Sequence, residues 1–339
     1  MALLDSKLTV ELDIWDRKTT DMLLQVPITF TNGDAAAPAI NIGGVTNTGY
    51  DLIVGYADRK GDFGYSLSAN ISGYTNEVDA LDNPDSRIFG YGSRVPSMTV
   101  TQQGAEISSF YGFKVLGIFQ SQSEADAWAP YGTYNSPGKF KIEDTNSDGQ
   151  INDSDRGIIG SPHADYTYGI NLNLDYKNWS INVFGNGSQG NELFNYVRFF
   201  ADFNSFQGNR STRALRDAWQ PSNPAAPKSS WTAANPNATS PIMDANDQTS
   251  SRVSTYLIED GSYFRIKNIQ LTYNFDDTIN SLLGIAGGQV YLQAQNFITI
   301  TDYSGLNPEV QTGADTTMGF DGGYMPVSKT VMVGLNINL

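Results

Sequence analysis

Apolar and polar residues alternate one by one over several stretches of this chain, and no other feature limits its fold as strongly. In the final segment, 330–339, every second residue is apolar: Val331, Val333, Leu335, Ile337 and Leu339. Successive side chains of a β-strand point to opposite faces, so an alternation with period two predicts a strand with one apolar face. We therefore expect an all-β protein.

Stretches of this kind recur along the whole chain and predict roughly nine strands. They cover residues 8–14, 49–59, 63–74, 109–119, 166–176, 179–184, 263–275, 289–301 and 330–339. Lys177 and Asn178 form a two-residue connection that is typical of a β-hairpin. Other connections are polar and far longer than hairpin loops, namely 82–103, 121–164, 201–255 and 302–329.

Short turns that alternate with very long loops are typical of an outer-membrane β-barrel. Tyr166, Tyr176 and Trp179 stand at strand ends, where such barrels carry girdles of aromatic residues. A soluble β-sandwich with inserted loops would produce the same alternation. Periodicity by itself therefore leaves both architectures open.

Composition excludes several classes of function. The formal net charge of -15 would repel a phosphate backbone, so we expect no nucleic-acid partner. The chain has no Cys and one His, which removes disulfide frameworks, thiolate metal sites and most His-dependent catalysis. No apolar run approaches the roughly 20 residues of a membrane-spanning helix, so a helical membrane protein is excluded.

The first residues carry no secretory signal, because an alternating pattern starts almost at once after Met1. Either the protein is cytosolic or its beginning is missing from this sequence.

The segment 144–155, DTNSDGQINDSD, has the spacing of a calcium-binding loop around the turn residue Gly149. Oxygen ligands at positions 1, 3, 5, 7 and 12 can converge on one ion, and these positions hold Asp144, Asn146, Asp148, Gln150 and Asp155. Gln150 would contribute its backbone carbonyl. The alternative is a solvated acidic turn without metal. No other cofactor is required.

Three further motifs favour structural roles. The glycine-rich GNGSQG at 185–190 fits a dinucleotide-binding pattern but lacks the surrounding βαβ rhythm, so we interpret it as a turn. His163 has no nucleophile placed by a recognisable motif, which favours a structural role. Glu259 and Asp260 are adjacent, and neighbouring strand residues point to opposite faces, so this pair favours a charged turn over a glycosidase pair.

Aromatic residues are scattered through the long loops, where they can stack on sugar rings or meet a protein lid. The alternative is that they pack the loops against one another. The residues in question are Trp219, Trp231, Tyr256, Tyr303 and Tyr324.

Several motifs follow one another in a fixed order along the chain. RKTTDMLL at 17–24 is followed by NIGGVTNTGYDLIV at 41–54. These two look like paired signatures of the SusC/RagA family of TonB-dependent outer-membrane transporters. The run 144–195 resembles its acidic loop, hairpin and glycine-rich turn, and 256–275, 290–310 and the final strand resemble its last strands. The chain departs from the family pattern at Ala164, where Pro is frequent, and at Leu339, where an aromatic residue is usual.

This resemblance implies an antiparallel transmembrane β-barrel with long extracellular loops. The family's barrels have about 22 strands around a plugged lumen, so roughly nine strands cannot close one. We therefore expect residues 1–339 to be the C-terminal part of the barrel, without the plug domain and the N-terminal strands.

The resemblance also implies a function, which is part of an importer of oligosaccharides or peptides in the outer membrane rather than an enzyme. Expected partners are a SusD-like surface lipoprotein, the glycan or peptide ligand, outer-membrane lipid, and the TonB complex through the missing N-terminal part. One alternative is a TonB-dependent siderophore or cobalamin receptor, which would lack the lipoprotein. Another is a secreted, calcium-binding, carbohydrate-binding β-protein, which would be soluble without detergent.

Overall fold

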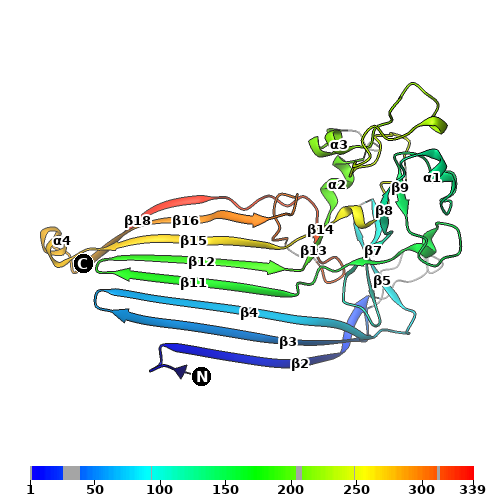
Figure 1. Ribbon diagram of the computed structural model, residues 1–339. Helices are drawn as coiled ribbons and strands as arrows, with labels where there is room; N and C mark the ends of the chain where they lie inside the picture. Colours follow the sequence, from blue (N-terminus) through cyan, green and yellow to red (C-terminus); the bar gives the residue numbers. More distant parts are fainter. Residues whose placement is uncertain (1, 26–38, 93, 204–207, 248, 311–313) are drawn as a thin grey trace.

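The computed structural model describes residues 2–25, 39–92, 94–203, 208–247, 249–310 and 314–339. Its main feature is a nine-stranded sheet in which every strand pairs antiparallel with the next (Figure 1). Its order follows the sequence: β1 (Ala2–Leu3), β2 (Leu8–Gln25), β3 (Ala39–Lys60), β4 (Phe63–Ala80), β11 (Tyr166–Tyr176), β12 (Trp179–Gln189), β15 (Tyr263–Asn274), β16 (Gly287–Thr301) and β18 (Thr330–Asn338). An all-β fold is confirmed.

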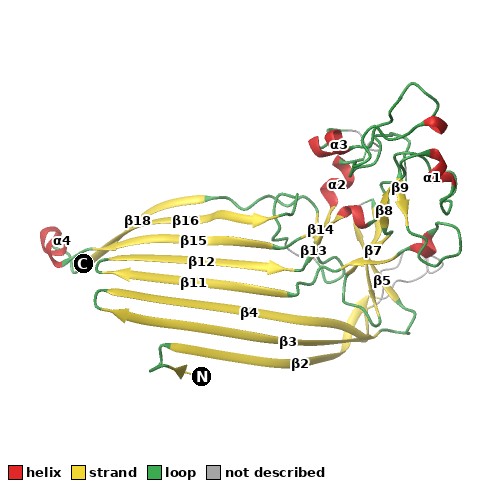
Figure 2. Ribbon diagram, viewed as in Figure 1, coloured by secondary structure: helices red, strands yellow, loops and turns green. Residues whose placement is uncertain are grey.

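Connections at one end of this sheet are short. Two residues join β3 to β4, and Lys177 and Asn178 join β11 to β12 as predicted, with Lys177 at a φ of 52°. The helix α4 (Asp277–Leu283) joins β15 to β16 (Figure 2). The Asp276 side chain caps its first turn, and Gly284 ends it with a φ of 67°, a conformation that glycine adopts without strain.

At the opposite end the connections 81–165, 190–262 and 302–329 fold together, and we call their described residues the loop assembly (Figure 1). Three small sheets lie in it: β10-β7-β6-β5, β14-β13-β17 and β8-β9. Their strands are β5 (Arg87–Gly92), β6 (Val95–Gln102), β7 (Ser109–Gly112), β8 (Val115–Ile118), β9 (Phe140–Ile142), β10 (Gly157–Gly160), β13 (Glu192–Asn195), β14 (Ile258–Asp260) and β17 (Phe320–Asp321). Its helices are α1 (Gln122–Asp126), η2 (Asp153–Asp155), α2 (Tyr196–Ala201), α3 (Thr212–Asp217), η3 (Lys228–Ser230) and η4 (Thr255–Leu257).

The larger apolar core lies inside the loop assembly. Its most buried members come from segments far apart in the chain and are 1% exposed or less: Met98, Phe110, Phe113, Phe194, Trp219 and Leu257. Burial of large aromatic side chains is the main source of stability for such a unit. The long connections are therefore a packed structure rather than free loops.

Two sequence-based predictions about strands are wrong. Residues 109–119 do not join the main sheet, because they form β7 and β8 in two different small sheets. All four residues of β7 are buried, so the apolar run belongs to a core covered on both sides. The prediction that 82–103 is a loop is also wrong, since this connection contains β5 and β6. The first strand extends well beyond the predicted 8–14, to Gln25.

Within the described residues, no helix has both the length and the hydropathy needed to cross a membrane.

Candidate functional site

The main sheet has one apolar face, which we define by rows of side chains in register across its strands. One row runs through six strands: Tyr65, Leu174, Ile181, Leu271, Leu292 and Val333. Val333 is 75% exposed, and Leu292 and Leu271 are also exposed. A contiguous row of exposed apolar side chains of this kind is unusual on a soluble monomer. The described residues leave this apolar face uncovered.

Aromatic residues border this face at both ends of the strands. Near the short turns, Phe63, Tyr176, Trp179 and Tyr273 form one row in register. Near the loop assembly, Tyr168 and Phe264 stack with ring centroids 5.9 Å apart and planes at 2°. Gly187 lies between them, where a Cβ atom would be 2.5 Å from the Tyr168 ring. The glycine thus makes room for the aromatic pair.

The opposite face of the same strands is lined by uncharged amides, and we call it the amide face. Asn182 donates to Asn171 at 2.9 Å and to Asn173 at 2.6 Å, and Asn268 donates to Asn182 at 3.2 Å. The network continues from Gln293 to Asn268 at 2.6 Å. Buried or half-buried amides are stable when they satisfy one another in this way. The centre of the amide face is therefore a polar surface built from uncharged side chains over β11 to β16.

The segment after β16 is tied to the main sheet near the amide face by an ionic cluster. Arg265, with a side chain 2% exposed, donates to Glu309 at 2.6 Å and to Asn307 at 2.8 Å. Lys267 contacts the same Glu309 carboxylate at 2.6 Å. A buried guanidinium is stable only when it is paired. This cluster was not predicted from the sequence, because Glu309 lies 42 residues after Lys267 and 44 residues after Arg265. Its only local signal is the presence of basic residues within a strand.

A second ionic cluster holds the loop assembly together. Asp202 accepts hydrogen bonds from Arg198 at 3.1 Å, Arg213 at 2.8 Å and Tyr256 at 3.0 Å. Arg198 also contacts Glu259 at 3.1 Å. These contacts join helices α2 and α3 to η4 and β14.

Charge and burial act in opposite directions on the acids of this cluster. Burial alone would raise the pKa of Asp202, but the hydrogen bond from Ser211 and the charges of Arg213 and Arg198 outweigh it and lower that pKa below its ordinary value. Burial would also raise the pKa of Glu259. The hydrogen bond from Ser304 and the charge of Arg198 outweigh burial, so the pKa of Glu259 lies below its ordinary value. Both acids are therefore ionised at neutral pH.

The residues predicted to bind calcium lie on one exposed loop that ends in η2. Asp144 accepts from the backbone N–H groups of Asp148 and Gly149, and Asp148 accepts from that of Gln150 at 2.9 Å. Asp155 is 1% exposed and accepts from the backbone of Thr145 at 2.9 Å.

Hydrogen bonds of side chains with one another and with the backbone hold this loop in a tight turn. The Asn146 amide donates to Asp148 at 3.0 Å, and the other oxygen of Asp155 accepts from the Asn152 N–H at 2.8 Å. No group of three or more acids, His or Cys within the described ranges is gathered closely enough to define a metal centre. The calcium site stays a prediction.

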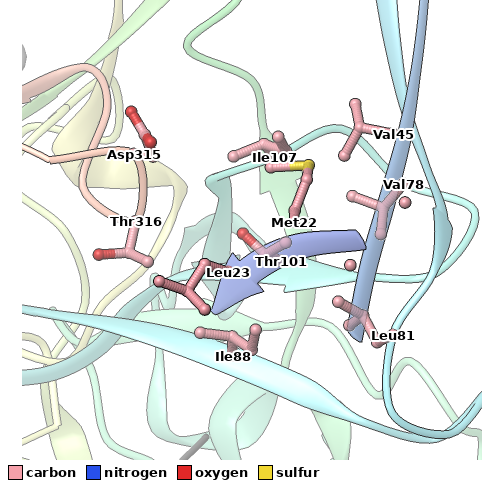
Figure 3. Close-up of a pocket in the computed structure, with 12 residues that line it drawn as sticks. Met22, Leu23, Val45, Val78, Leu81, Ile88, Thr101, Ile107, Asp315 and Thr316 are labelled. Atoms are coloured by element: carbon pink, nitrogen blue, oxygen red, sulfur yellow. The ribbon is translucent and has the colours of Figure 1, made fainter. Parts of the chain in front are cut away.

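A small apolar cavity of about 80 Å³ lies where the ends of β2, β3 and β4 meet the loop assembly (Figure 3). Met22, Val45 and Val78 come from these strands, and Ile88 and Ile107 close the cavity from the loop assembly. Asp315 and Thr316 form its polar border. The cavity marks a joint between the sheet and the loop assembly that is not fully packed.

The remaining motifs from the sequence take structural positions. The interpretation of GNGSQG as a turn is wrong, because residues 185–189 belong to β12. Only Gly190 follows the strand, with a φ of 85°. The prediction of a charged turn at Glu259 and Asp260 is also wrong. Both residues belong to β14, which pairs with β13 and is therefore extended. Trp219 is 1% exposed and Tyr303 5%, so these two aromatics pack the loops, whereas Tyr324 is exposed.

His163 bridges the main sheet and the loop assembly. Its Nε2 lies 2.9 Å from the Ile107 carbonyl oxygen and its Nδ1 lies 3.1 Å from the Tyr74 hydroxyl. The carbonyl accepts from Nε2–H, so in the neutral ring Nδ1 accepts from the tyrosine. This arrangement agrees with the predicted structural role.

Comparison with known proteins gives consistent results. No family model matches the chain. It is 30% identical over 347 residues to TonB-dependent receptor P3 of Formosa agariphila, and 27% identical over 343 residues to TonB-dependent receptor SusC of Bacteroides thetaiotaomicron. These matches cover 99% and 98% of this chain, but 33% and 30% of the relatives.

Solved structures show the same fold. The chain matches the structure of the RagAB peptide transporter with a TM-score of 0.76 and 23% identity, over 98% of this chain and 34% of that one. The RagAB peptide importer in its open-open state matches with a TM-score of 0.74 and 22% identity, over 100% of this chain and 33% of that one. The chain thus spans about a third of the length of the proteins it matches, and over that third it is a SusC/RagA-type TonB-dependent receptor sequence with a partial β-barrel fold.

Proposed function

We propose that this chain forms part of the wall and the extracellular loops of an outer-membrane, TonB-dependent importer of oligosaccharides or peptides. The observation that carries the proposal is the division of one sheet into an exposed apolar face and a polar amide face, with the long connections gathered into the loop assembly at one end. In a barrel, the apolar face meets lipid and the polar face lines the lumen.

The spacing of the aromatic residues supports a membrane position. Tyr166 and Tyr176 are ten residues apart in β11, which at about 3.3 Å per residue is about 33 Å along the strand. A strand tilt of about 40° projects this length to about 25 Å, the height of the apolar band of outer-membrane barrels. The loop assembly would then lie on the extracellular side, where captured ligands arrive.

In this proposal the chain performs no bond chemistry. The loop assembly contacts the ligand, the amide face supplies hydrogen-bond donors and acceptors along the lumen, and a plug outside this sequence opens when TonB pulls on it. Uncharged amides bind hydroxyl groups and peptide groups equally well, which suits both ligand classes. We propose residues 1–339 as the C-terminal part of the barrel, with plug and N-terminal strands encoded outside it.

The names of the matched proteins support a lipoprotein partner. SusC is among the relatives and RagAB, described as a peptide transporter, is among the structures. We therefore propose a SusD-like lipoprotein that sits over the loop assembly. A siderophore or cobalamin receptor would lack it.

The proposal is tested in cells that carry the intact gene together with its neighbouring lipoprotein gene. Fluorescent oligosaccharides and peptides should enter the periplasm with both genes present and should fail to enter when either gene is deleted. A tagged lipoprotein should also co-purify with the receptor from detergent extracts. Uptake of an iron chelate without any lipoprotein would instead establish the siderophore receptor, and recovery of the protein without detergent would support the secreted β-protein.

We also propose that the loop 144–155 binds one calcium ion in the assembled protein. The donor set is chemically suitable, because Asp144, Asn146 and Asp148 offer side-chain oxygens from neighbouring positions of one ordered turn. Calorimetric titration with calcium should show binding that Asp148→Asn weakens, with Asp82→Asn, an exposed acid outside this loop, as the control. Equal heats for both variants would contradict the site.

A further inference from the structure

A hollow of about 250 Å³ opens at the end of the apolar face that is next to the loop assembly, where β12, β15 and β16 reach it. Its floor is apolar and consists of the stacked rings of Tyr168 and Phe264 together with Ile300, which is 64% exposed. Its rim is polar, and the residues there are Gln189, Asp260, Ser262, Thr301 and Asp302. We call this the rim pocket.

The register of the strands places the rim pocket on the apolar face. Phe264 pairs with Ile300 and Gly187, and Gly187 pairs with Tyr168, so their side chains share a face. Gln189 lies two residues beyond Gly187 on β12, so it continues the same face beyond the aromatic pair, and Asp302, which directly follows β16, lines the same pocket. The rim pocket therefore opens outward, at the boundary between the apolar band and the loop assembly.

The pocket is held in shape by contacts among the strand ends. The Ser262 hydroxyl accepts from the Gly190 N–H at 3.0 Å and from the Gln189 amide at 3.1 Å, while Thr301 donates to the Ser262 carbonyl at 2.8 Å. The Asp302 carboxylate is engaged by no hydrogen bond or ion pair from the part of the chain that the structure describes. An ordered frame thus presents one open acceptor above an aromatic floor.

We propose that the rim pocket binds the sugar headgroup of a glycolipid in the outer leaflet, an inference that rests on the proposed membrane position. Aromatic rings pack against the C–H face of a sugar, and carboxylates and amides accept its hydroxyl groups. The charged residues that line the pocket are both acids, Asp260 and Asp302, so a bare phosphate headgroup would be repelled.

The surface below the pocket favours a lipid-linked sugar over a free one. Ile298 and Leu292 lie on the same face of β16 as Ile300, nearer to the short turns, and both are exposed. This apolar track continues from the pocket floor toward the short-turn end of the sheet, which suits acyl chains attached to the bound sugar. A free sugar in solution would gain nothing from that track.

The test uses the whole receptor that carries this chain, purified in a neutral detergent and examined by native mass spectrometry. The probes are a dephosphorylated lipooligosaccharide, phosphatidylethanolamine with matched acyl chains, and the free oligosaccharide released from the same glycolipid. We expect the glycolipid alone to remain bound, and Asp302→Asn to weaken its binding about tenfold, as for loss of a charge-assisted hydrogen bond. Asp277→Asn on α4, an exposed acid at the opposite end of the sheet, should bind like the wild type.

Other results overturn the inference. Equal retention of phosphatidylethanolamine would show general lipid contact only. Equal binding of the free oligosaccharide would make the pocket a solution sugar site. Loss of glycolipid binding on removal of divalent cations would show that a bridging cation, rather than contact with sugar hydroxyl groups, holds the ligand. Detergent extraction and ligand uptake are measured on the same variants, so that a receptor that inserts and imports normally but ignores glycolipid refutes this inference alone.

Discussion

Arg265 on β15 and Glu309, 44 residues later, form an ion pair of 2.6 Å that fastens the segment after β16 to the main sheet. Its arginine side chain is 2% exposed, whereas Glu309 is 35% exposed. The guanidinium of Arg265 is therefore more strongly desolvated than the carboxylate of Glu309. The pair makes Glu309 the residue on which the position of this segment depends.

Replacing Glu309 with Gln should destabilise this joint. The variant leaves a buried guanidinium and Lys267 without a counter-charge, which in comparable sites costs about 3 kcal/mol. Hydrogen exchange of residues 302–310 should rise strongly in the variant. Glu77→Gln, an exposed position on β4, is the matched control and should change little. Unchanged exchange in Glu309→Gln would show that the pair does not position the segment.

The loop assembly should lose stability in acid. The pKa values of Asp202 and Glu259 lie below their ordinary values of 3.8 and 4.5, so both acids stabilise the folded state above those values. That contribution is lost as the pH falls below about 4 and through the lowered folded-state pKa values. The protection factors of the α2 and β14 amides should therefore decrease as the pH falls below about 4, and Asp202→Asn should flatten this dependence.

Glu192 should act with the opposite sign. Burial raises its pKa above the ordinary 4.5, so its charged form is unfavourable in the folded state at neutral pH. Glu192→Gln retains an oxygen that can accept from the Ser161 N–H and removes the charge. Thermal unfolding should show a more stable variant at pH 7, with the difference disappearing as the pH falls below about 4. A variant less stable than wild type at pH 7 would refute this interpretation.

Two glycines of β3 should respond oppositely to alanine. At Gly44, which lines the cavity in Figure 3, a Cβ would meet its nearest neighbour at 3.7 Å, so Gly44→Ala should stabilise by about 0.5 kcal/mol. At Gly49 a Cβ would lie 2.5 Å from the Trp15 ring and 2.6 Å from the Gly73 carbonyl, so Gly49→Ala should destabilise by about 1–3 kcal/mol. Denaturant unfolding of the two variants compares them directly, and equal effects would contradict the packing at both sites.

The sequence was a good guide where one side of a strand is exposed. Residues 166–176 and 179–184 alternate cleanly because the apolar face and the amide face have different surroundings, and their hairpin was predicted at the correct turn. The motifs quoted for the family were sufficient to predict the fold and the relatives.

Prediction failed where both sides of a strand are buried. Phe110 and Phe113 belong to the loop core, where alternation disappears and a run such as 109–119 looks like one long strand. The ionic clusters around Arg265 and Asp202 were missed for another reason. Their partners come from distant segments, and spacing along the chain carries no information on such contacts.

Two adjacent residues of β11 test the central claim most directly. Leu172 lies on the apolar face midway between the aromatic rows, and Asn173 lies on the amide face. In a membrane barrel, Leu172→Arg places a charge in lipid at a cost of about 2–4 kcal/mol, whereas Asn173→Arg places it toward a polar lumen. The measurement is the amount of folded receptor in outer-membrane fractions. We predict a strong loss for Leu172→Arg and near-normal assembly for Asn173→Arg; equal assembly of both, or loss of Asn173→Arg alone, would contradict the assignment of the apolar face to lipid.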